Sequence, residues 1–205
     1  MLSRVVAALV VGAGLAVAAP SAPAFAQSSP DIHADPSYEA TLDFLRGGAP
    51  AGRGGVYAAS PVPRQTVRFE SNHRPGTIVI RSGERRLYLV QEGGRALRYG
   101  IGVGRPGFSW RGSHRITAKR EWPDWRPPAQ MLRRQPNLPR HMPGGPNNPL
   151  GARAMYLGST LYRIHGSNEP HTIGQAVSSG CIRMTNDDVV HLYNQVKVGT
   201  MVVVQ

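Results

Sequence analysis

The residues of this chain with the clearest capacity for chemistry lie in the stretch 178–184, which holds its only cysteine, Cys181. A single thiol cannot form a disulfide within its own chain, so Cys181 is a packed core residue, half of an intermolecular bridge or a reactive nucleophile. A thiol reacts as its thiolate, and a nearby imidazole can take the proton and stabilise the anion. His165 is the leading candidate for this base, because it ends a predicted strand and the intervening residues allow a turn and a return.

Glycines flank both groups, with Gly166 after the histidine and Gly180 before the cysteine. Glycine lets backbone N–H groups approach a reacting carbonyl closely. We therefore expect backbone donors near Gly180 and Cys181 to form an oxyanion hole, as acyl transfer requires. Arg183 lies two residues further on and supplies a cation for a substrate carboxylate.

The spacing of these residues by itself leaves catalysis and a structural cysteine both open. His171 and His191 compete with His165 as the base, although each also fits an ordinary surface histidine. The three histidines and Cys181 could also be combined into a metal site, but their spacings match no common zinc pattern. We expect neither a metal nor a cofactor.

The first 26 residues have the pattern of a secretory signal peptide. Arg4 supplies the positive start, residues 5–19 the apolar run, and Ala24-Phe25-Ala26 the cleavage site. The uninterrupted apolar run is shorter than the roughly 20 residues that span a bilayer. The sequence thus predicts removal of residues 1–26, no stable membrane insertion after cleavage, and a periplasmic location.

The composition is strongly basic, with 24 Lys and Arg against 12 Asp and Glu and a formal net charge of +12. Such a charge favours association with an anionic partner. Nucleic acid would require an intracellular location, which the signal peptide opposes. An anionic polymer outside the cytoplasm is therefore the expected partner.

Two regions differ in pattern after the signal peptide. Residues 27–74 are rich in Ser, Pro, Ala and Gly and predict a linker, with one amphipathic patch at 38–45 that fits a short helix. From residue 75 onward, short runs of β-branched and aromatic residues between turns predict strands of an antiparallel meander; they are 77–80, 87–90, 96–103, 154–157, 162–165 and 201–204. A helix follows the cysteine, with Asn186 as its expected N-cap and an apolar stripe ending at Val196.

Residues 120–150 contain repeated prolines, which exclude an ordinary helix or central strand and predict a long, partly rigid loop. Trp122 and Trp125 give this loop apolar surface that could fold over a ligand, and both are candidate substrate-binding residues. The alternative is that they anchor the loop to the core.

The runs IHGS (164–167), TIG (172–174) and SSGCIRMTNDD (178–188) together resemble the signature of the L,D-transpeptidase family with the YkuD-type catalytic domain. The resemblance covers residues 75–205. It implies a mainly β fold, a YkuD-like β-sandwich catalytic domain, with a short helix after the catalytic loop and the long Pro- and Trp-rich loop. It also implies bacterial peptidoglycan stem peptides as the substrates.

The resemblance assigns roles residue by residue. Cys181 is the nucleophile and His165 its base, while Gly166, Ser179 and Gly180 shape the site and Arg183 supports it. Many relatives have histidine in place of Ser179, so only a backbone role carries over to that position. The implied reaction forms a thioester on the cysteine, releases D-alanine from a tetrapeptide stem and transfers the acyl group to an amine.

Three functions remain open from the sequence. Transfer to an amine acceptor is preferred, and the candidate acceptors are another stem peptide, an outer-membrane lipoprotein or a free D-amino acid. Hydrolysis of the same bond, as in an L,D-carboxypeptidase or endopeptidase, would use the same acyl-enzyme. A noncatalytic basic module that binds cell-wall polymer would instead leave Cys181 as a packed residue.

Overall fold

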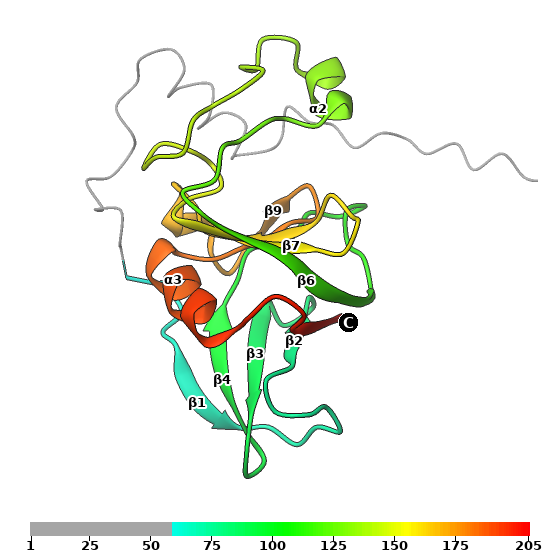
Figure 1. Cartoon of the computed structure of the whole chain (residues 1–205), viewed down its shortest axis with the longest axis vertical. Helices are drawn as coiled ribbons and strands as arrows, with labels where there is room; N and C mark the ends of the chain where they lie inside the picture. Colours follow the sequence, from blue (N-terminus) through cyan, green and yellow to red (C-terminus); the bar gives the residue numbers. More distant parts are fainter. Residues whose placement is uncertain (1–58) are drawn as a thin grey trace, which may run out of the picture.

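The computed structural model describes residues 59–205 (Figure 1). The expected signal peptide (1–26) and short helix (38–45) lie outside the described residues. The strands are β1 (Gln65–Arg68), β2 (Ile78–Arg81), β3 (Arg86–Gln91), β4 (Arg95–Gly100), β5 (Val103–Gly104), β6 (Gly112–Glu121), β7 (Arg153–Leu157), β8 (Arg163–His165), β9 (Ala176–Ser178), β10 (Ile182–Arg183) and β11 (Met201–Val204). The helices are α2 (Ala129–Arg134), the 3-10 turn η2 (Pro170–Thr172) and α3 (Asn186–Gln195).

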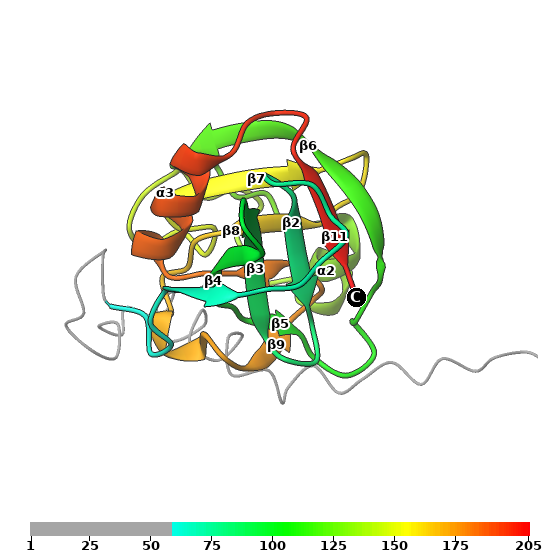
Figure 2. The ribbon, with the colours of Figure 1, turned by 90° about the horizontal axis from the view of Figure 1, so that it is seen from below.

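One bent sheet supplies both layers of the fold, in the order β1-β4-β3-β2-β11-β6-β7-β8-β10. The ten-residue strand β6 joins them, because its first half pairs with β11 and its second half with β7. A register shift between Ile116 and Ala118 marks the change of partner, as expected of a bulge that bends a strand. Figure 2 shows β11 between β2 and β6, so the last strand of the chain closes the first layer.

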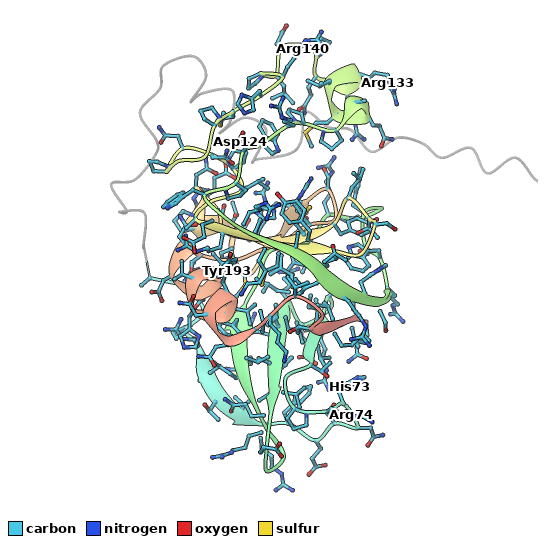
Figure 3. The ribbon with its side chains drawn as sticks, in the orientation of Figure 1. His73, Arg74, Asp124, Arg133, Arg140 and Tyr193 are labelled. Atoms are coloured by element: carbon cyan, nitrogen blue, oxygen red, sulfur yellow. The ribbon has the colours of Figure 1, made fainter. Side chains whose placement is uncertain are left out.

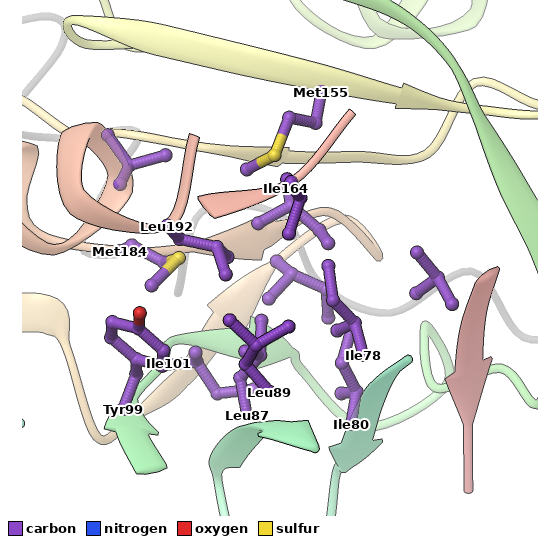
Figure 4. Close-up of a cluster of buried hydrophobic side chains, with 14 of the residues drawn as sticks. Ile78, Ile80, Leu87, Leu89, Tyr99, Ile101, Met155, Ile164, Met184 and Leu192 are labelled. Carbon is purple, nitrogen blue, oxygen red and sulfur yellow. The ribbon is translucent and has the colours of Figure 1, made fainter. Parts of the chain in front are cut away.

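The main hydrophobic core lies between the two layers (Figure 4). Ile78 and Leu87 come from the first layer and Met155 and Ile164 from the second, and all four are fully buried. Helix α3 covers one side of this core with Leu192. The expected mainly β sandwich with a short helix after the cysteine loop is therefore confirmed.

The expected linker (27–74) extends too far toward the C-terminus. Residues 65–68 form β1, which pairs antiparallel with β4 at the edge of the first layer. Arg64 adds a further contact, since its guanidinium lies 2.9 Å from the Asp188 carboxylate on α3. This strand could not be predicted from the sequence, because three of its four side chains are exposed and show no apolar alternation.

Two local expectations at helices were also wrong. The N-cap of α3 is Thr185, whose hydroxyl accepts a hydrogen bond from the Asp188 N–H, and Asn186 is already the first helical residue. The proline-rich stretch contains the six-residue helix α2, which begins directly after Pro128. Proline disrupts a helix interior but is tolerated where a helix begins, so a helix fits between the prolines.

No helix within residues 59–205 is long and apolar enough to cross a membrane.

The core makes a direct prediction for stability. Leu192→Ala removes a fully buried side chain that packs between α3 and both layers, and should lower the free energy of unfolding by about 2–5 kcal/mol. The exposed Val198, two residues after Val196, provides the control, and Val198→Ala should cost less than about 0.5 kcal/mol. Urea unfolding measures both. Equal losses in the two variants would show that α3 does not complete the core.

Candidate active site

Two neighbouring parallel strands place the predicted nucleophile and base on one face of the second layer. In the register of β8 and β10, His165 lies opposite Arg183 and Ile164 opposite Ile182. Cys181 directly precedes β10, and its side chain lines the same cavity as those of Arg183 and His165. The opposite face carries Ile164 and Ile182, which are buried in the main core. Hydrophobic burial of one face thus fixes which side chains emerge on the other.

That outward face forms one wall of a cavity of about 490 Å³. The segment between β6 and β7, which includes α2, forms the facing wall, and Figure 1 shows it above β7 and β9. The cavity is lined by Arg105, Phe108, Trp125, Pro128, Gln130, Met131, Arg134, Gln135, Leu138, Pro149, Leu150, Leu161, Tyr162, Arg163, His165, Ser178, Ser179, Cys181 and Arg183.

His165 is held as a neutral ring. Its Nδ1 lies 2.6 Å from the carbonyl oxygen of Gly166, which can only accept, so Nδ1 carries the proton and Nε2 keeps a lone pair. Burial lowers the pKa of His165 to about 3, and the guanidinium of Arg183 acts in the same direction. The imidazole is therefore a neutral base at neutral pH.

Cys181 is partly exposed, and its sulfur lies 3.8 Å from the carbonyl oxygen of Leu161. Ser178 closes the loop before it, because its hydroxyl donates to the Cys181 carbonyl (2.6 Å) and accepts from the Gly180 N–H (3.1 Å). The Gly180 N–H is thereby occupied. Within residues 59–205 the Cys181 N–H has no acceptor, which makes it the better candidate of the two for an oxyanion donor.

An aromatic pair supports the same loop from outside. Trp110 stacks on Tyr162 with ring centroids 4.3 Å apart and donates its indole N–H to the Gly180 carbonyl (2.7 Å). Gly180 has φ +107°, and a Cβ there would lie 2.6 Å from the Tyr162 ring. Only glycine fits this position without moving the aromatic pair.

The two predicted polar supports of the site already have partners. Arg183 lines the cavity and forms an ion pair with the buried Glu169 at 3.0 Å. The hydroxyl of Ser179 also faces the cavity and accepts from Arg105 at 3.5 Å. Glu169 thus holds the Arg183 guanidinium in position, and the Ser179 side chain makes a polar contact with Arg105.

The tryptophans and competing histidines lie in different places. Trp125 lines the cavity and packs on Leu138 and Leu150, so it both anchors the loop and faces the site. Trp122 does not line it, and its backbone instead packs against Gly144. His171 and His191 also lie outside the cavity lining, with His191 bonded to the Tyr99 hydroxyl at 2.9 Å.

No group of three or more His, Cys, Asp or Glu side chains in the described part of the chain is placed to hold a metal ion.

The comparison with known families decides the classification. Residues 75–204 match the family described as YkuD, the L,D-transpeptidase catalytic domain. The chain belongs to the L,D-transpeptidase family. The resemblance drawn from the residues around Cys181 and His165 is therefore confirmed at the level of the family, whose members are acyltransferases that act on peptidoglycan.

Similar L,D-transpeptidases include two probable enzymes of Escherichia coli K12. YbiS is 37% identical over 151 residues, and ErfK/SrfK is 39% identical over 150 residues. Each match covers 69% of this chain and 47% of the relative, so the chain spans about half the length of the curated relatives it matches. The structure of L,D-transpeptidase 3 from Mycobacterium tuberculosis has the same fold, with a TM-score of 0.50 at 17% identity over 63% of this chain and 60% of that one.

Sequence reasoning missed several groups that build the site. Glu169 was overlooked because its partner, Arg183, is 14 residues away in the sequence and the strand β10 that carries Arg183 was not predicted. The Trp110–Tyr162 stack was missed for the same reason. The dipeptide Ser178-Ser179 was a usable signal, since a serine two residues before a glycine can bond to its own turn.

The buried imidazole predicts a pH dependence of stability. Above pH 6.5, His165 is neutral in both the folded and the unfolded state. Between pH 6.5 and about pH 3, the imidazole is protonated in the unfolded chain but stays neutral in the folded protein. Folding stability should therefore fall by up to about 1.4 kcal/mol per pH unit in this window. His165→Gln, which cannot titrate, should have a shallower slope in urea unfolding series at successive pH values.

The exposed His171 is the matched control for this measurement, because replacing it leaves the buried imidazole of His165 in place. His171→Gln should keep the wild-type slope. A His165→Gln variant with the wild-type slope would contradict a buried neutral imidazole.

The geometry of the loop before Cys181 predicts that a side chain at position 180 lowers the stability of the fold. Gly180→Ala places a Cβ at φ +107° and 2.6 Å from Tyr162, and should destabilise the protein by at least about 1 kcal/mol. Gly83 has open space around it, so Gly83→Ala should change stability by less than about 0.5 kcal/mol. Thermal unfolding measures the stability of both variants, and a Gly180→Ala variant as stable as Gly83→Ala would refute this geometry.

Proposed function

We propose that this protein is a periplasmic L,D-transpeptidase that acts on peptidoglycan tetrapeptide stems through a thioester on Cys181. The observation that carries the proposal is that Cys181, directly before β10, and a neutral His165, at the end of the paired strand β8, line one cavity. A merely structural cysteine would not need an adjacent base or an opening to solvent. The bond attacked joins the third stem residue, meso-diaminopimelate, to the terminal D-alanine.

The proposed acylation step uses the neutral imidazole and the unbonded Cys181 N–H. Cys181 Sγ attacks the scissile carbonyl carbon while His165 Nε2 takes the thiol proton. The resulting oxyanion receives a hydrogen bond from the Cys181 N–H. Collapse breaks the carbon–nitrogen bond, D-alanine leaves with the proton from His165, and the tripeptide stays as the thioester.

The second step transfers the acyl group to an amine. The acceptor nitrogen attacks the thioester carbonyl, its proton passes to His165, and cleavage of the carbon–sulfur bond returns that proton to Cys181. The carbonyl of Gly166 stabilises the transient imidazolium through its bond to Nδ1. Another stem peptide or an outer-membrane lipoprotein would supply the amine, and water in its place would give hydrolysis.

The charge of the cavity supports a substrate rich in carboxylates. Its lining includes Arg105, Arg134, Arg163 and Arg183, and no Asp or Glu of residues 59–205 lines it. A wall with one sign of charge raises the local concentration of anionic substrate. The roles proposed for Gly166, Ser179, Gly180 and Trp125 are to shape this cavity around the stem.

Mass spectrometry of the enzyme with a purified tetrapeptide muropeptide tests the proposal. The wild type should gain the mass of a tripeptide acyl group, and Cys181→Ala should gain none while remaining folded. With time, cross-linked dimers indicate transfer and trimmed tripeptides indicate hydrolysis. Retained turnover in Cys181→Ala, or a wild type that forms neither acyl-enzyme nor product, would refute the mechanism.

A further inference from the structure

The peptide unit between Gly180 and Cys181 carries the candidate oxyanion donor at one end. Its carbonyl accepts a hydrogen bond from the indole N–H of Trp110 at 2.7 Å, and within residues 59–205 this is the only hydrogen bond that the carbonyl makes. Its N–H, which belongs to Cys181, has no acceptor in the same part of the chain. The carbonyl and the N–H of a planar trans peptide point in opposite directions, so the Cys181 N–H points away from the indole.

This peptide unit needs a contact from outside the loop to keep its orientation. Gly180 has φ +107°, and glycine has more backbone freedom than any other residue. The Ser178 hydroxyl accepts from the Gly180 N–H and donates to the Cys181 carbonyl, but these groups belong to the two neighbouring peptide units. The bond from Trp110 therefore restrains the unit between them.

Trp110 is itself held in place, in the segment between β5 and β6. Its ring stacks on Tyr162 with the two planes 4° apart, and His114 packs against it in a T-shaped arrangement with ring centroids 5.5 Å apart. Trp110 does not line the cavity, whereas Tyr162 and Cys181 do. A substrate carbonyl would enter that cavity, between the second layer and the segment on which Figure 3 labels Arg133.

We propose that Trp110 is a positioning residue that holds the Gly180–Cys181 peptide with its N–H facing the cavity, where it stabilises the oxyanion of acylation. This inference rests on the proposed function. A carbonyl that accepts a hydrogen bond polarises its peptide, so the Trp110 bond also makes the Cys181 N–H a stronger donor. A donor already aimed at the developing charge needs no reorganisation when the oxyanion forms. Trp110 thereby acts on the reaction without contacting substrate.

Two reactions of the Cys181 thiol separate this role from a general structural one. Acylation by p-nitrophenyl acetate joins Sγ to the carbonyl carbon through an oxyanion, transfers the thiol proton to His165 and releases p-nitrophenolate. Alkylation by iodoacetamide joins Sγ to a saturated carbon, transfers the same proton and releases iodide, but forms no oxyanion. A misoriented N–H should therefore lower only the acylation rate, whereas a disordered site would lower both.

Trp110→Phe keeps an aromatic ring beside Tyr162 but removes the indole N–H. Because loss of one oxyanion donor costs about 100- to 1,000-fold in rate, misorientation of the Cys181 N–H should slow acylation by about tenfold or more. The alkylation rate should stay at the wild-type value, and Cys181→Ala supplies the background of both reactions. Trp122→Phe is the matched control, since it makes the same change at an indole outside the cavity lining and should leave both rates unchanged.

Benzothienylalanine at position 110 keeps the shape of the indole and replaces its N–H with sulfur, so it should reproduce the effect of Trp110→Phe without a smaller ring. Wild-type acylation in either variant, or equal losses of acylation and alkylation, would overturn the inference. Failure of the proposed function is seen separately, because it concerns the stem. A wild type that p-nitrophenyl acetate acylates and the tetrapeptide does not would refute the proposed substrate and leave the comparison at Trp110 unchanged.

Discussion

The hydrogen bond between His165 Nδ1 and the Gly166 carbonyl oxygen, 2.6 Å long, is the contact on which the proposed chemistry of the cavity depends. It fixes the tautomer, so the other ring nitrogen remains an acceptor in an environment where burial and Arg183 both oppose protonation. In the proposed mechanism this neutral base takes a proton only when charge develops beside it, and the Gly166 carbonyl then stabilises the cation. Glu169 offsets part of the opposing charge by pairing with Arg183.

That hydrogen bond depends on tight backbone packing behind the site. A Cβ on Gly166 would lie 2.2 Å from the Asn186 side-chain oxygen, so β8 approaches the start of α3 as closely as glycine allows. The same oxygen accepts from the Ala152 N–H at 2.8 Å. Asn186 therefore joins the start of α3 to the residue before β7, the strand that pairs with β8, and the core packing of Leu192 holds the helix in place.

Much of the framework could be predicted from the sequence, because β2, β3, β4, β7, β8, β11 and α3 bury apolar residues in regular patterns. The ten-residue strand β6 escaped prediction because Ile116 is its only buried side chain and polar residues occupy both faces. The nucleophile and base could be proposed from the residue types around Cys181 and His165, which local sequence carries. The contacts of the surrounding side chains could not be predicted, because pairs such as Arg183 with Glu169 depend on tertiary packing.

The central claim is that neutral His165 activates Cys181, and the rate of thiol alkylation by iodoacetamide at pH 7 tests it most directly. The folded wild type should react faster than His165→Gln by roughly tenfold or more, because a positioned base assists proton removal. The unfolded proteins, in which the two residues no longer share a cavity, should react at equal rates. Equal rates in the folded proteins would contradict the account and leave Cys181 as a structural residue.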